Sequence, residues 1–254
     1  MSTVQLGPKI GLILQVILLA ILATTVGLGV VGWVTGVAYG LITCAALARG
    51  LYRAGVGALG PGDRVTLTRA TLVGCVAALT ADSFHQRARI EVLVSIAIVA
   101  LILDAVDGQV ARRTGTASGL GACFDMEVDA FLILVLSVYV ARSMGAWVLA
   151  IGAMRYAFVV ASWAMRWMSG PLPQRFWRKV VAATQGVVLV FATADVLAVP
   201  LMVAALAVAL ALLVESFGRD VVWLWRHGVV ESHRLARSSS RLALATLADH
   251  DRSA

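Results

Sequence analysis

The chain has 254 residues, of which 60% are hydrophobic and 14% are charged, whereas soluble domains carry about 25% charged residues. This composition excludes an ordinary soluble domain and predicts an all-α, polytopic membrane helix bundle, because apolar stretches of about 18 to 20 residues recur along the chain. The net charge of +7 does not indicate nucleic-acid binding, because most basic residues form short clusters between apolar runs, as orientation signals do.

The first predicted elements are two membrane spans within residues 10–48, a segment that is apolar but too long for one crossing. Gly27, Gly29 and Gly32 offer a place for a tight turn between the two spans. A segment rich in glycine and proline follows and predicts a loop. Residues 1–62 are therefore expected to form an N-terminal appendage of two spans and a loop.

Six further helices are predicted after this appendage. Asp63 is expected to cap the first of them, which runs to about Ala81. The other predicted spans are 90–111, 120–141, 145–166, 179–194 and 198–216. Residues 63–216 then form a six-helix membrane core. Residues 217–254, which are rich in Ser, Arg and His after Arg226, are expected to be a cytoplasmic tail that is disordered or surface-associated.

The basic residues predict the orientation of these spans, because cytoplasmic loops of membrane proteins carry an excess of Lys and Arg. A cytoplasmic N-terminus places these basic groups on the cytoplasmic side: Arg49 and Arg53, Arg64 and Arg69, Arg112 and Arg113, Arg175 with Arg178 and Lys179, and Arg219 with Arg226. Arg87, Arg89 and Arg142 fall on the other side. The sequence thus predicts an integral, multi-pass protein of the cell membrane with its N-terminus inside.

Four aspartates lie where two predicted spans meet. Asp104 and Asp107 are spaced i, i+3 at the end of one span, and Asp125 and Asp129 are spaced i, i+4 at the start of the next. Each pair projects from one helix face, so a hairpin of the two helices can bring the four carboxylates together. Clustered carboxylates require cations, and oxygen-only ligands favour Mg²⁺ or Mn²⁺ over Zn²⁺. Two bound ions can clamp a pyrophosphate and stabilise an in-line displacement.

Small residues and an arginine accompany the aspartates. Gly108 and Ala111 share a helix face with the first aspartate pair, which leaves space for a ligand at the level of the backbone. Arg112, just beyond them, can reach phosphate oxygens. Close packing of membrane helices is the alternative role for Gly108 and Gly121.

Arg155 falls near the middle of a predicted span, where an ionisable residue is a functional candidate by default. The alternative is a structural pair between Arg155 and an acidic group such as Glu127. A nearby basic group can bind a phosphate, or can be a plain orientation cluster; its members are Arg175, Arg178 and Lys179.

The spacing of eight residues across this region resembles the signature of the CDP-alcohol phosphotransferase family, also named CDP-alcohol phosphatidyltransferases. These residues are Asp104, Asp107, Gly108, Ala111, Arg112, Gly121, Asp125 and Asp129. The resemblance covers about residues 63–216 and implies a six-helix membrane core that forms a homodimer. It implies metal-dependent transfer of a phosphoalcohol group, usually phosphatidyl, from a CDP-linked donor such as CDP-diacylglycerol to an acceptor alcohol. CMP is released, and the products belong to phospholipid biosynthesis.

The resemblance also implies roles for individual residues. The four aspartates would bind two metal ions, and Asp129 would also be the catalytic base toward the acceptor hydroxyl. The residues that would bind the CDP moiety are Asp63, Thr66, Gly108, Ala111, Arg112, Ser118 and Gly121. Because CMP is soluble and the usual donor is a lipid, the active site is expected to open to the cytoplasm.

An ion or proton-coupled membrane transporter is the alternative function, because intramembrane carboxylates also line proton and cation pathways. A transporter explains the acidic residues but not the Gly-Ala-Arg pattern between them. The motif does not choose the acceptor alcohol, and the candidate basic residues around Arg155 favour a polyol phosphate.

Overall fold

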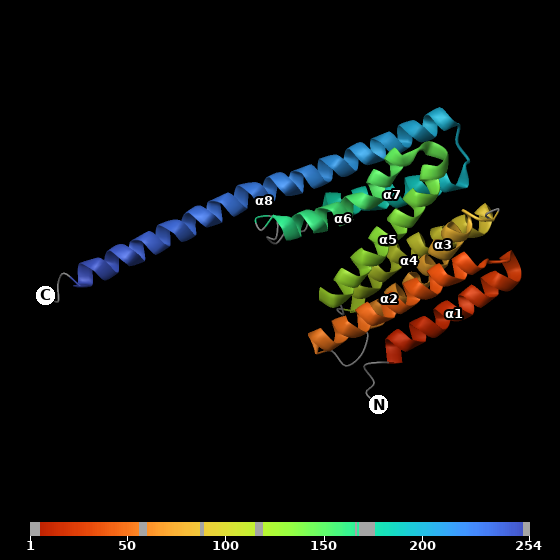
Figure 1. Cartoon of the computed structure of the whole chain (residues 1–254), viewed down its shortest axis with the longest axis horizontal. Helices are drawn as coiled ribbons and strands as arrows, with labels where there is room; N and C mark the ends of the chain where they lie inside the picture. The colour runs from red at the N-terminus through yellow and green to blue at the C-terminus, as the bar shows by residue number, and fades with distance from the viewer. Residues whose placement is uncertain are drawn as a thin grey trace. The chain divides into compact units, whose positions relative to one another are not determined.

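A computed structural model describes residues 6–55, 60–86, 89–114, 119–165, 167 and 176–250. In this part of the chain there are eight α-helices, one short 3-10 helix and no strand (Figure 1). The elements are α1 Leu6–Val26, α2 Val30–Ala54, α3 Pro61–Asp82, α4 Ile90–Thr114, α5 Gly119–Met144, η2 Ala146–Val148, α6 Leu149–Ala164, α7 Phe176–Ala194 and α8 Val199–His250. The predicted all-α architecture is confirmed, and two helices precede α3, the first helix of the predicted six-helix core.

Five helical segments within the described residues are long and apolar enough to cross a membrane: Gly7–Val26, Val30–Ala54, Gly62–Asp82, Ala146–Ala164 and Val199–Arg226. In four of them, only 17% to 28% of the residues in the most apolar window are buried, whereas the figure for α3 is 78%. The four segments therefore present apolar side chains to their surroundings, as a multi-pass membrane protein does. For α4, α5 and α7, which form helices as predicted, crossing the membrane stays a prediction.

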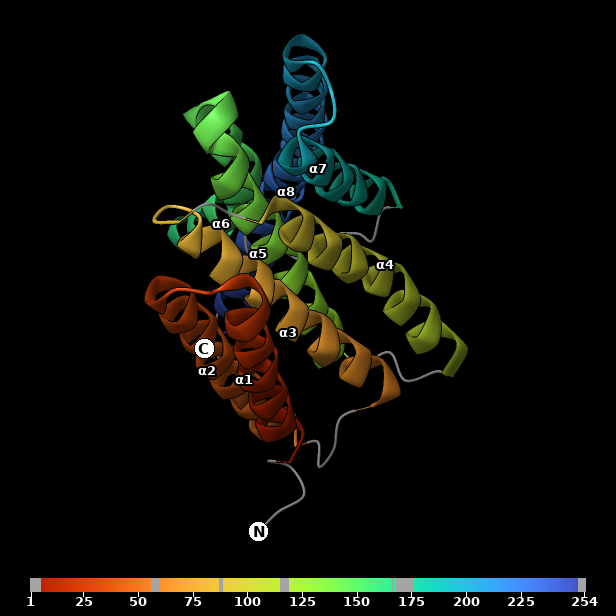
Figure 2. The ribbon, with the colours of Figure 1, turned by 90° about the vertical axis from the view of Figure 1, so that its right-hand side faces the viewer.

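The chain divides into two compact units, residues 1–153 with 183–210 and residues 154–182 with 211–254. In the first unit α3 is the central helix, because it packs against α1, α2, α4 and α5. Figure 2 shows α4 running beside α3 and the α1–α2 hairpin lying against the same helix. The strong burial of α3 follows from this position.

The start of α3 is fixed by a local cap. The backbone N–H of Gly60 donates to the carboxylate of Asp63 at 3.0 Å, and Pro61 occupies the first helical position. Proline suits this position because it has no N–H to leave unsatisfied. The N-cap is therefore Gly60, three residues before the predicted Asp63, which takes part in the cap from the third helical position.

The turn between α1 and α2 lies at residues 27–29, within the predicted glycine segment. Gly27 has φ +79°, a conformation that L side chains rarely adopt. The N–H of Gly29 donates to Asp82 Oδ2 at 3.1 Å, and a Cβ on Gly29 would lie 2.5 Å from Asp82 Oδ1. Glycine at this position thus lets the hairpin tip bind the end of α3. Gly32, also expected in the turn, belongs to α2.

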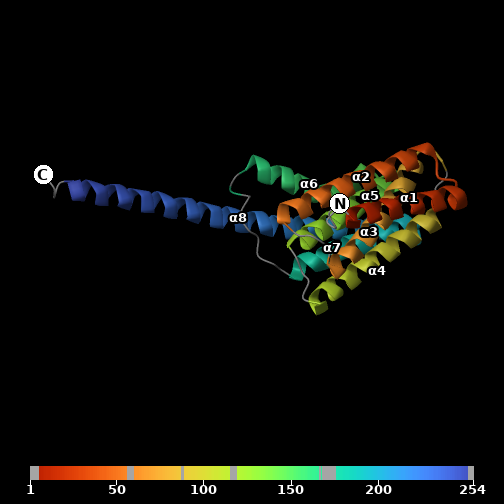
Figure 3. The same ribbon diagram turned by 90° about the horizontal axis from the view of Figure 1, so that it is seen from below.

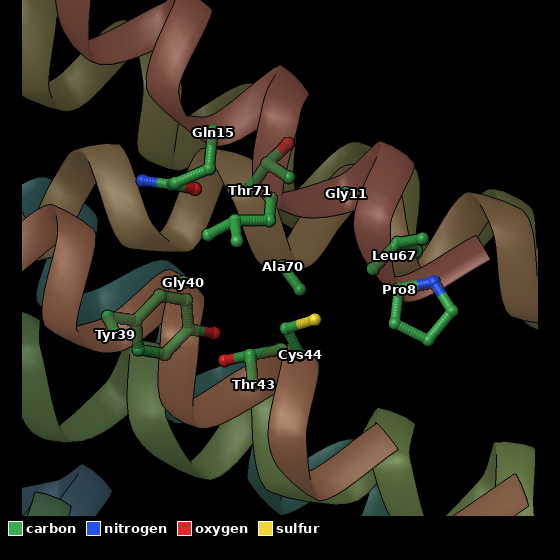
Figure 4. A pocket seen from close by; sticks show the side chains of 11 residues that line it. Pro8, Gly11, Gln15, Tyr39, Gly40, Thr43, Cys44, Leu67, Ala70 and Thr71 are labelled. Atoms are coloured by element: carbon green, nitrogen blue, oxygen red, sulfur yellow. The ribbon is translucent and has the colours of Figure 1, made fainter. Parts of the chain in front are cut away.

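A small pocket lies between the hairpin and α3 (Figure 4). Gln15 lies beside it on α1 and is 1% exposed, and neither amide atom has a hydrogen-bond partner among the described residues. Gly74 on α3 faces this amide, because a Cβ there would lie 2.6 Å from Gln15 Nε2. The α1–α3 contact therefore contains a buried polar group as well as apolar surface.

A cluster of buried leucines joins the hairpin to the core. We call Leu47, Leu51 and Leu67 the leucine cluster; Leu120 and Phe124 of α5 pack against it. The N-terminal appendage therefore contacts the first turns of α5 as well as α3.

α8 is one helix from Val199 to His250 (Figure 3). It passes residue 217, the predicted start of the tail, without interruption. The backbone of α8 is helical up to His250, and the expectation of a disordered cytoplasmic tail stays a prediction. A surface-associated tail stays a prediction.

Candidate metal centre and active site

Three of the four predicted aspartates meet in the first unit. Asp104 comes from α4, and Asp125 and Asp129 come from α5. One carboxylate oxygen from each can be chosen so that all three atoms lie within 4.8 Å of one another. The side chains are 37%, 35% and 32% exposed, in that order. Asp107 lies on the α4 backbone, and its side chain is outside the described part of the structure.

A buried arginine of α3 binds all three carboxylates. Arg69 is 1% exposed, and its Nη1 pairs with Asp104 Oδ1. Its Nη2 pairs with Asp125 Oδ1 and lies 3.0 Å from Asp129 Oδ1. Nη2 also donates to the backbone carbonyl of Asp125 at 3.2 Å. One guanidinium therefore connects α3, α4 and α5 at the acidic cluster.

The charge of the cluster favours further cations. Three carboxylates at −1 each, against one guanidinium at +1, leave a formal charge of −2 on these four side chains. The carboxylates offer hard oxygen donors, close together and about a third exposed. Oxygen donors of this kind suit Mg²⁺ and Mn²⁺. The residues present therefore fit the divalent metal that the sequence predicted.

The contacts of Arg69 were not foreseen from the sequence. Arg69 was counted there among the charges that orient the chain in the membrane, which stays a prediction, whereas the structure shows its guanidinium paired with three carboxylates inside the helix bundle. One signal was available. An arginine within a predicted span, on the same helix face as Thr66 and Val73, requires partners within the protein.

The residues predicted to bind CDP are only partly described. Asp63 and Thr66 lie in the first turns of α3, where Thr66 Oγ1 donates to the Gly62 carbonyl at 3.3 Å. Gly121 lies in the first turn of α5. On α4, the side-chain positions of Gly108, Ala111 and Arg112 lie outside the described part of the structure, as does all of Ser118. Their role toward CDP stays a prediction.

The predicted acceptor residues that the structure describes belong to the second unit. Arg155 lies on α6, and Arg178 and Lys179 lie on α7, whereas Arg175 lies outside the described residues. The Nε of Arg178 is 3.3 Å from Oδ2 of Asp220, which is 5% exposed in this pair. An acceptor phosphate at Arg178 would compete with this buried carboxylate. The acceptor role of these residues stays a prediction.

Comparison with known proteins identifies the family. The family model described as CDP-alcohol phosphatidyltransferase matches residues 62–214, more than half of the 254 residues. No curated protein and no solved structure matches the chain. The matched segment contains Arg69 and all eight signature positions, and it begins after α2. The chain therefore belongs to the CDP-alcohol phosphatidyltransferase family.

Proposed function

We propose that this protein transfers a phosphatidyl group from CDP-diacylglycerol to an acceptor alcohol that itself carries a phosphate, with release of CMP. The family acts in lipid synthesis by transferring a phosphatidyl group from a CDP-alcohol. The observation that carries the proposal is the group of three carboxylates, Asp104, Asp125 and Asp129, with one oxygen of each within 4.8 Å of the others. A transporter would not need the accompanying Gly-Ala-Arg pattern of the signature.

The three aspartates, together with Asp107, are proposed to hold two Mg²⁺ or Mn²⁺ ions. The family depends on divalent metal, which supports this assignment. When bound, the metal neutralises charge on the pyrophosphate of the donor as the leaving group departs.

The remaining chemistry is assigned to residues of the chain. Asp129 accepts the proton of the acceptor hydroxyl. The hydroxyl oxygen then bonds to the phosphorus that carries diacylglycerol, the bond from this phosphorus to the bridging oxygen breaks, and CMP leaves with that oxygen. Among the residues proposed to bind CDP are Asp63, Gly108 and Arg112, the last through phosphate oxygens.

The acceptor is proposed to be anionic. A guanidinium can bind a phosphate through two parallel hydrogen bonds, which gives a mid-span arginine such as Arg155 a ligand. Arg175, Arg178 and Lys179 add positive charge after the same predicted span. A polyol phosphate fits these residues better than a neutral alcohol.

The site is proposed to face the cytoplasm, and the protein to act as a homodimer. The distribution of basic residues between the predicted spans supports the orientation. The dimer follows from the family resemblance alone.

An acceptor panel tests the proposal. Purified protein receives labelled CDP-diacylglycerol, Mg²⁺ or Mn²⁺, and one acceptor at a time: glycerol phosphate, inositol phosphate, serine or a neutral polyol. We expect CMP and one lipid product, only with metal and with a phosphorylated acceptor. Asp125→Asn protein is the control and should release no CMP. Metal-dependent product with a neutral acceptor would contradict the anionic-acceptor assignment, and absence of CMP release with every acceptor would favour a transporter.

A further inference from the structure

Arg69 makes direct contacts to the acidic cluster although it is not one of the eight signature positions. We propose that Arg69 is a positioning residue, which holds the metal-binding carboxylates from their buried side and preforms the site before metal arrives. This inference rests on the proposed metal centre, and it assigns a function to a residue of α3 that the aspartate motif does not include.

The exposure of the four side chains places the guanidinium beneath the carboxylates. Arg69 is 1% exposed, whereas the three aspartate side chains are between 32% and 37% exposed. The arginine therefore approaches from the protein interior, and the carboxylates keep an accessible side. A metal ion can approach from that side while Arg69 stays in place.

The shape of the guanidinium suits this role. Nη1 binds the carboxylate of Asp104 on α4, while Nη2 binds the carboxylates of Asp125 and Asp129 on α5. The two nitrogens are held in one rigid plane, so the distance between the α4 carboxylate and the α5 carboxylates is set by covalent geometry. A lysine ammonium keeps the charge but is a single point, and it cannot impose that distance.

Two physical effects give Arg69 influence over metal affinity. Without the arginine, the three negative charges repel one another when no metal is bound, so the cluster opens and must be reassembled by the ion. Outer partners of metal ligands also orient the ligand atoms, and their replacement lowers metal affinity by about 10 to 100-fold. We therefore expect Arg69 to strengthen metal binding, although the guanidinium and the metal ion are both positively charged.

Arg142 provides a matched control. It lies on α5 and donates from Nη1 to Ser83, the residue that follows α3, with a distance of 2.8 Å to the carbonyl and 2.7 Å to Oγ. Its guanidinium carbon is also 4.7 Å from the centre of the Phe84 ring. Arg142 thus joins the α3 and α5 segments, as Arg69 does, but among the described residues its hydrogen bonds and ring contacts are to Ser83, Phe84 and Tyr139 and not to an aspartate of the cluster.

The experiment is a Mn²⁺ titration of the full-length protein, followed by electron paramagnetic resonance of the free ion. We compare wild type, Arg69→Lys and Arg142→Lys, and we measure the thermal midpoint of each with metal chelated. Arg69→Lys should weaken Mn²⁺ binding by about 10 to 100-fold. Arg142→Lys should lower the thermal midpoint and leave Mn²⁺ affinity unchanged. Wild-type affinity in Arg69→Lys would overturn the inference, and tighter binding would show that Arg69 competes with the metal.

Failure of the metal centre itself gives a different result. If wild type binds no Mn²⁺, or if Asp125→Asn binds it as wild type does, both the proposed metal centre and this inference are wrong. Should Arg69→Lys fold poorly, the half-saturating Mg²⁺ concentration for CMP release is measured in membranes, because this value does not depend on the amount of folded protein. It should rise by the same factor, and an unchanged value would overturn the role of Arg69.

Discussion

Leu120 on α5 lies directly over Gly50 on α2, because a Cβ on Gly50 would be 2.6 Å from Leu120 Cδ1. Leu120 also packs against the leucine cluster, together with Phe124. Phe124 directly precedes Asp125 of the acidic cluster. The hairpin α1–α2, which lies before the family segment 62–214, therefore supports the helix that carries two of the candidate metal ligands.

Deletion of residues 1–50 should leave the catalytic chemistry intact and lower the thermal stability of the protein. The deleted residues contain none of the signature positions, but their loss removes the packing of the hairpin on α3 and leaves Asp82 without the N–H of Gly29. Thermal midpoint and CMP release are measured on truncated protein that has inserted correctly. The variant Leu120→Ala keeps the hairpin and should show a smaller loss of stability. Complete loss of activity in the truncation would show that the hairpin belongs to the site.

Each of Asp104→Asn, Asp107→Asn, Asp125→Asn and Asp129→Asn should nearly abolish turnover without preventing membrane insertion. An amide retains the size of the carboxylate but not the negative charge that binds a divalent ion. EDTA should inactivate the wild type, and Mg²⁺ or Mn²⁺ should restore it. Turnover is measured as CMP release, and insertion as recovery of folded protein in detergent. Wild-type turnover in well-inserted Asp125→Asn would contradict the mechanism.

Arg155→Lys should raise the KM for a phosphorylated acceptor and change the KM for the CDP donor little. The lysine keeps the charge but loses the two parallel hydrogen bonds that a guanidinium makes with phosphate. Arg155→Ala should have the larger effect. Acceptor and donor KM are determined in parallel on folded protein, because equal weakening of both would indicate a structural role instead. Full activity of Arg155→Ala with an uncharged alcohol would also contradict a phosphate-binding role.

Gln15→Met should stabilise the protein. The amide of Gln15 is 1% exposed and has no hydrogen-bond partner among the described residues, and a buried unsatisfied polar group costs about 1 to 3 kcal/mol. Methionine is similar in size and shape and removes this cost. Gln185, also 1% exposed, is the matched control because its Nε2 donates to the Ala209 carbonyl at 2.8 Å, so that only its Oε1 is without a partner among the described residues.

The two glutamine variants should shift the thermal midpoint in opposite directions, with Gln15→Met raising it and Gln185→Met lowering it. Activity should stay unchanged in Gln15→Met, because this residue has no contact with the acidic cluster among the described interactions. A lower midpoint in Gln15→Met would show that a water molecule in the adjoining pocket binds the amide.

The helices and the aspartate faces could be predicted from the sequence because both depend on local properties. Apolar length and helical periodicity place the helices, and the i, i+4 spacing puts Asp125 and Asp129 on one face of α5 whatever the rest of the chain does. The glycine segment likewise marks the turn at Gly27, because its φ of +79° disfavours other residues. After Arg226, where the composition predicted a disordered or surface-associated tail, the structure continues α8 to His250.

The tertiary structure alone decided what lies beneath the aspartates. Arg69 is separated by 35 residues from Asp104 and by 56 from Asp125, and no local pattern specifies which helix faces meet across such distances. In the sequence its charge looked like one more cytoplasmic orientation signal. Packing of α3 against both α4 and α5 removes that guanidinium from solvent, and a buried charge must then bind the nearest opposite charges. The same central position of α3 brings the hairpin to Leu120, a contact that depends on the shapes of two helix surfaces rather than on either sequence segment alone.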